Sequence, residues 1–81
     1  MNTINIAVIN RLLEYMGERN LTQYKLAQLC GLPFATVKSI MQRRCNGISL
    51  RTLILLCNGL NITVSEFLDH PTFLPENLDL D

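Results

Sequence analysis

The sequence predicts a compact all-α domain of five short helices. Apolar residues make up 48% of the 81-residue chain and recur mainly at intervals of three and four, which is helical spacing. Ser or Thr stands before several of these segments, at the position where a side chain caps a helix. A chain of this length fits one domain, whose core must be compact and local.

The first helix is indicated by an apolar stripe at positions i, i+3, i+4 and i+7, formed by Ile9, Leu12, Leu13 and Met16. The weak alternation of Ile4, Ile6 and Val8 is interpreted as the lead-in to this helix. Nothing else in the sequence indicates a strand.

Two short helices joined by a tight turn are expected next. Thr22 is a good N-cap for a second helix over Gln23–Cys30, and Gly31 ends that helix. Pro33 is tolerated in the first turn of the third helix, which is expected over residues 34–42.

A polar loop then leads to the last two helices. Ser49 is expected to cap a fourth helix that runs through Leu60. Thr63 and Glu66 have the spacing of a capping box, which starts a short fifth helix ending at Leu68.

The charges are unevenly distributed, although seven Lys and Arg balance seven Asp and Glu. Residues 21–65 carry five cations and no acid, whereas residues 66–81 carry five acids and no Lys or Arg. A local basic field can attract phosphate groups even when the total charge is zero. A solvated surface that simply holds these charges is the alternative.

Composition argues against an enzyme, a metal protein and a membrane protein. There is one His, no Gly-rich phosphate loop and no apolar run long enough to span a membrane. The three cysteines are odd in number and lie far apart, which indicates reduced thiols rather than a disulfide frame or a zinc site. No secretory signal is recognisable, so a cytoplasmic protein is expected, without cofactor, metal or evident small-molecule ligand.

The second and third expected helices carry the functional signal. Two helices joined this closely must cross steeply, which needs apolar or small residues at fixed places. Counted from Gln23, the apolar places four, eight, ten, fifteen and eighteen hold Leu26, Cys30, Leu32, Val37 and Ile40. The fifth place holds the small Ala27, and the ninth holds Gly31, where the turn needs positive φ.

The run from Gln23 to Ile40 resembles the DNA-binding helix-turn-helix of the Cro/phage-repressor type, the Xre family. The resemblance extends over residues 9–68 and includes the fourth and fifth helices. It implies a lambda-repressor-like DNA-binding domain, expected over residues 1–70. Residues 71–81 are then an acidic C-terminal tail, which we expect to be loosely ordered.

The resemblance also implies a set of site residues. It implies that the third helix enters the major groove of double-stranded DNA. The candidate base-reading residues are Phe34, Ala35, Thr36, Lys38 and Ser39. The candidate DNA-backbone residues are Gln23, Gln42, Arg43 and Arg44. Helical spacing partly agrees, because it turns Ala35, Lys38, Ser39 and Gln42 away from an inward face of Val37, Ile40 and Met41.

Phe34 departs from the family pattern, in which Gln or Ser is frequent at this position. Neither Phe34 nor Ala35 can form the paired hydrogen bonds that an amide makes with adenine. Contact with thymine methyl groups is the remaining direct option, and packing of Phe34 against Met41 in the core is the alternative. Likewise, Lys38 is either a DNA contact or a solvated charge, and Thr36 either a contact or a surface filler.

The favoured hypothesis is a small transcriptional regulator that binds specific DNA, as a homodimer on a palindromic operator. Ile54 and Leu55 lie off the apolar stripe of the fourth helix, so one or both are exposed at a dimer contact or buried by another element. The alternative function is a protein-interaction module on the same fold, such as an antitoxin or anti-regulator, with weak or lost base readout.

Overall fold

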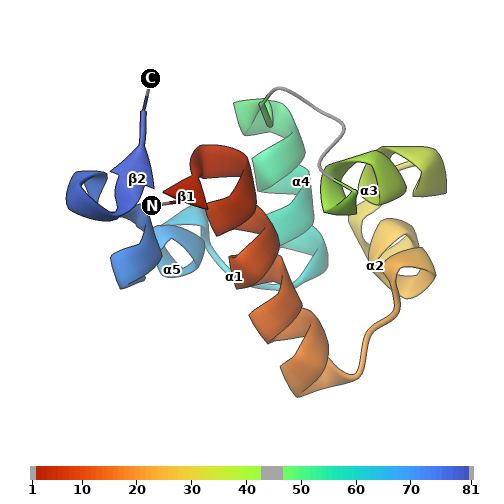
Figure 1. Cartoon of the computed structure of the whole chain (residues 1–81). Coiled ribbons are helices and arrows are strands. Elements are labelled where there is room, and N and C mark those ends of the chain that lie inside the picture. Colours follow the sequence, from red (N-terminus) through yellow and green to blue (C-terminus); the bar gives the residue numbers. More distant parts are fainter. Residues whose placement is uncertain (1, 43–46, 81) are drawn as a thin grey trace.

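A computed structural model describes residues 2–42 and 47–80 of the chain. Within them, the five α-helices predicted from the sequence are all present (Figure 1). They are α1 (Ile4–Arg19), α2 (Gln23–Cys30), α3 (Phe34–Met41), α4 (Leu50–Gly59) and α5 (Val64–Leu68). The all-α prediction is therefore confirmed. Arg43, Arg44 and Cys45 lie outside the described residues.

Helix capping explains where four of the helices begin. The hydroxyls of Thr3, Thr22, Ser49 and Thr63 each accept a hydrogen bond from the backbone N–H three residues later, over 3.0–3.2 Å. Pro33 is the exception, since it precedes α3 at the cap position instead of lying in the first turn as expected. Its carbonyl accepts hydrogen bonds from the N–H groups of Thr36 and Val37.

One buried cluster of apolar side chains joins the five helices. Its largest fully buried side chains are Leu12 of α1, Leu26 of α2, Val37 of α3, Leu56 of α4, Leu60 at the end of α4 and Phe67 of α5. Leu13 is half exposed, which corrects its place in the predicted stripe. The buried face of α1 instead centres on Val8, Leu12 and Met16, and Leu13 lies about 100° around the helix from Leu12.

The C-terminal segment differs from the expectation of a loosely ordered tail. It forms two 3-10 turns, η1 (Pro71–Phe73) and η2 (Pro75–Asn77), and then β2 (Leu78–Asp79). β2 pairs in parallel with β1 (Asn2–Thr3), so two short strands exist where the sequence indicated none. The ring of Phe73 lies 5.9 Å from that of Phe67, centroid to centroid, which attaches the segment to the core.

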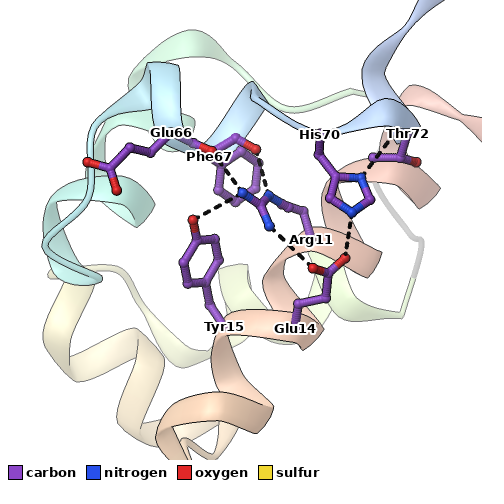
Figure 2. Close-up of polar contacts among 7 residues, drawn as sticks. All are labelled: Arg11, Glu14, Tyr15, Glu66, Phe67, His70 and Thr72. Atoms are coloured by element: carbon purple, nitrogen blue, oxygen red, sulfur yellow. Dashed lines mark hydrogen bonds and ion pairs between the residues drawn. The ribbon is translucent and has the colours of Figure 1, made fainter.

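A polar network joins α1 to α5 and to η1 (Figure 2). The Arg11 guanidinium donates hydrogen bonds of 2.8 Å to the carbonyls of Glu66 and Phe67, at the end of α5. Glu14 accepts from Arg11 and also contacts Nε2 of His70 at 3.3 Å. Because Nδ1 of His70 accepts the N–H of Thr72, Nε2 is the nitrogen that carries the proton toward Glu14.

Candidate nucleic-acid interface

α2 and α3 have the buried contacts that the sequence pattern requires. Leu26, Ala27, Cys30, Val37 and Ile40 are buried, and Leu32 is partly buried against the same cluster. Gly31 has φ 66°, the left-handed conformation in which a glycine is not strained. The predicted geometry of the tight turn is thereby confirmed.

The outward face of α3 is open. Ala35, Lys38 and Gln42 are exposed, and Thr36 and Ser39 are partly exposed. Val37 and Ile40 are buried and Met41 is partly buried on the opposite face, as helical spacing predicted. In Figure 1, α2 and α3 lie on one side of α1, and the C-terminal segment lies on the other. The tail therefore does not cover the predicted recognition face.

Phe34 lies outside the core. Its side chain is 42% exposed, so the alternative of packing against Met41 in the interior does not hold. Its ring meets that of Tyr24 in an edge-to-face arrangement, with centroids 5.8 Å apart. Tyr24 is 60% exposed and comes from the first turn of α2. Sequence reasoning missed Tyr24, although its position off the buried stripe of α2 was a usable signal.

A surface hollow lies between α3 and the start of α4. Thr36 and Ser39 line it from α3, and Ser49 and Thr52 line it from the beginning of α4. The Ser49 hydroxyl caps α4 and donates a hydrogen bond of 3.0 Å to the Thr52 hydroxyl, so both of its contacts are within the first turn of α4. The hollow thus places hydroxyl groups of two helices beside the outward face of α3.

The described cations fall into two groups. Arg11 and Arg19 are engaged by the protein itself, because each donates to a backbone carbonyl at the end of another helix. Lys25, Lys38 and Arg51 are exposed, and no described acidic side chain forms an ion pair with them. These three cations lie on α2, α3 and α4, so they remain available to an anionic partner.

Two buried thiols belong to the core. Burial, and secondarily the neighbouring Cys57, raises the pKa of Cys30 to about 11, and burial also raises the pKa of Cys57. Both groups therefore stay protonated at neutral pH. Among the described residues, no cluster of His, Cys, Asp or Glu has the arrangement to hold a metal ion. None of the described helices is long and apolar enough to cross a membrane.

Comparison with known proteins defines the class. The Cro/C1-type HTH DNA-binding domain family matches residues 11–72, which include all of α2 to α5 and most of α1. The chain belongs to this family. The matched segment contains the helix pair, the open face of α3 and the polar contacts of Arg11 described above.

A solved structure agrees with this assignment. The crystal structure of the prophage Lp1 protein 11 is similar to this chain, with a TM-score of 0.79 and 32% sequence identity. The match covers 90% of this chain and 96% of that one. No curated protein matches the sequence.

Proposed function

We propose that the chain is a transcriptional regulator that binds a specific double-stranded DNA sequence through α3. In this proposal α3 lies in the major groove, and its outward side chains face the base edges. The base-facing residues are Phe34, Ala35, Thr36, Lys38 and Ser39. The observation that carries the proposal is the open polar face of α3 in a Cro/C1-type domain, flanked by unpaired cations.

Four residues are proposed to contact the DNA backbone. Gln23 begins α2, whose N-terminal N–H groups and helix dipole favour an anion. Gln42 is the exposed residue that ends α3, and Arg43 and Arg44 follow it in the sequence. Such contacts fix the position of the protein on the duplex, whereas contacts with base edges select the sequence.

Selection from a random duplex library at two salt concentrations tests the proposal. We expect one enriched sequence, and an affinity that falls as salt rises because bound phosphates release counterions. Recovery of no preferred sequence at either salt concentration would contradict sequence-specific binding. Preferred sequences with no salt dependence would contradict the proposed backbone contacts.

We further propose that the regulator binds as a homodimer to a palindromic operator. Of the two residues named for this contact, Ile54 is 49% exposed and Leu55 is partly buried. Leu50, one turn before Ile54 on α4, is 66% exposed, and together Leu50 and Ile54 support a protein contact. Two half-sites about 34 Å apart are expected in the selected sequences, since that is one turn of DNA. Sedimentation that finds a 9.2 kDa species at high micromolar concentration would remove the dimer from the proposal.

A protein-interaction module remains the second candidate function. The same exposed Leu50 and Ile54 favour it, because an apolar patch of this kind can receive a partner protein. Specific co-purification with a second protein, together with no salt-sensitive DNA binding, would select this candidate over the regulator.

A further inference from the structure

The Tyr24–Phe34 pair is an exposed aromatic contact beside the outward face of α3. Both rings are large, exposed and apolar, and they belong to different helices. The interplanar angle is 60° and the centroid distance is 5.8 Å, which is the edge-to-face geometry that aromatic rings prefer. The Phe34 ring thus lies at the start of α3, outside the core and in contact with Tyr24.

The chemistry of Phe34 limits what it can recognise. Its ring and the neighbouring Ala35 methyl offer no hydrogen-bond donor or acceptor from their side chains. On the major-groove edges of the four bases, the thymine 5-methyl group is the distinct apolar feature. We propose that Tyr24 positions Phe34 to contact a thymine methyl group, so that this ring pair reads thymine in the operator. The inference rests on the proposed function.

The surroundings of the pair favour DNA over a protein as the partner. Lys25 follows Tyr24 on α2 and Lys38 lies one turn beyond Phe34 on α3, and both are exposed. Residues 21–65 contain no acidic side chain that would oppose a phosphate backbone. An apolar pair within a cationic surface suits a ligand that combines phosphates with apolar base edges.

The test replaces thymine by uracil, one position at a time, in a duplex that the wild-type protein selects. Uracil keeps the hydrogen-bonding groups of thymine and lacks only the methyl group. At one position in each half-site we expect the affinity of the wild-type protein to fall about three- to fivefold, the effect of one buried methyl group. The Phe34→Ala protein should bind both duplexes with similar affinity.

Variants of Tyr24 separate positioning from simple loss of structure. The thymine-to-uracil ratio is the affinity for the thymine duplex divided by the affinity for the uracil duplex. Tyr24→Ala should reduce this ratio. Tyr24→Phe keeps the aromatic ring, so its ratio should equal that of the wild type. Leu29→Ala is the matched control, because Leu29 is a 45% exposed apolar residue of α2 outside the aromatic contacts described. Its ratio should equal that of the wild type. Helical circular dichroism and the melting temperature of each variant show whether it is folded.

Two results distinguish failure of this inference from failure of the proposed function. If the wild-type protein selects no duplex, the proposed function fails and the inference falls with it. If it selects a duplex but no uracil substitution weakens binding, or Phe34→Ala retains the full ratio, only the thymine contact is wrong. Loss of binding to a partner protein in the ring variants, with unchanged DNA binding, would also overturn the inference.

Discussion

Gly59 on α4 lies directly against Cys30 of α2. A Cβ atom at this position would be 2.8 Å from both the backbone N and the Cα of Cys30, and 2.4 Å from its Sγ. The backbone atoms cannot rotate away as a flexible side chain can. The absence of a side chain at Gly59 therefore permits the close packing of α4 against α2, the helix that supports α3.

We expect Gly59→Ala to lower the free energy of unfolding by about 1–3 kcal/mol, because the added methyl group overpacks the α2–α4 contact. Gly17→Ala is the matched control, since a Cβ at Gly17 of α1 meets nothing within 4 Å. The control should be neutral or stabilising by up to about 1 kcal/mol. Urea denaturation of both variants measures the difference, and equal stabilities would show that the contact is not tight.

The buried Cys30 thiol predicts a loss of stability at alkaline pH. Its pKa is raised from 9.0 to about 11 in the folded chain, so folding favours the protonated form. That contribution is complete below pH 9 and is lost as the pH rises from about 9 to about 11. One proton changes stability by up to about 1.4 kcal/mol per pH unit in this interval.

Comparison with Cys30→Ala isolates this effect, because every other titratable group is present in both proteins. The free energy of unfolding of the wild type should fall more steeply between pH 9 and pH 10.5 than that of the variant. Parallel curves would mean that Cys30 ionises as easily in the folded chain as in the unfolded one.

At the scale of elements, α1 supplies arginines to the C-terminal ends of two other helices. Arg11 donates to the last carbonyls of α5, and Arg19 donates to the carbonyl of Leu60, which ends α4. The Tyr15 ring lies close to both guanidinium groups, with its centroid 4.8 Å from Cζ of Arg11 and 5.4 Å from Cζ of Arg19. Cations at these positions satisfy carbonyls that a helix leaves without partners and complement its dipole.

The Arg11 contacts shown in Figure 2 predict that Arg11→Lys is not a conservative change. An ammonium group cannot reproduce the forked donation to Glu66, Phe67 and the Tyr15 hydroxyl. We expect a loss of about 1.5–3 kcal/mol in the free energy of unfolding, the range for hydrogen bonds to charged groups. Lys25→Ala, which changes an exposed unpaired cation, should stay within about 0.5 kcal/mol of the wild type. If thermal denaturation gives the two variants equal stability, the network adds nothing to the fold.

Features that depend on neighbouring residues were predictable from the sequence, and features that depend on distant ones were not. Thr22, Ser49 and Thr63 mark helix starts because a cap and its helix are adjacent in the chain. Arg11 and Phe67 are separated by 56 positions, and no local sequence pattern predicts their contact. For the same reason the contact between Gly59 and Cys30, which lie on different helices, was not predictable from the sequence.

The candidate site was predictable to a similar extent. Helical periodicity placed Lys38 and Gln42 on the outward face of α3, and the structure exposes both. It left open whether Phe34 lies inside or outside, because a residue at the edge of a helical stripe is decided by its neighbours in space. In the structure Phe34 is exposed and contacts Tyr24 from the preceding helix.

At the scale of the whole molecule, the helices that carry Lys25 and Lys38 and the acidic C-terminal segment lie on separate sides. Figure 1 shows α2 and α3, the helices that carry Lys25 and Lys38, on one side of α1, and the segment of residues 69–80, which carries three acids, on the other. Asn77 donates to the carbonyl of Pro71, and the β1–β2 pairing holds the end of this segment beside the N-terminal strand. This arrangement keeps the acids of residues 69–80 away from α2 and α3.

The proposed orientation on DNA predicts how cation removal affects binding. In the proposed orientation Arg43 and Arg44 each neutralise a phosphate. The double variant Arg43→Ala/Arg44→Ala should therefore weaken binding to all duplexes and reduce the slope of log affinity against log salt by about 1.8. Lys38→Ala on the outward face of α3 should instead change the preferred sequence more than the affinity for unrelated duplexes.

Fluorescence anisotropy with the selected duplex and an unrelated duplex, over a range of salt concentrations, measures both effects. Gln28→Ala is a suitable uncharged control on the exposed face of α2 and should leave the slope unchanged. If removing the arginine pair changes neither the affinity nor the slope on any duplex, the basic segment after α3 does not face the DNA. The proposed orientation of the domain on the duplex would then be wrong.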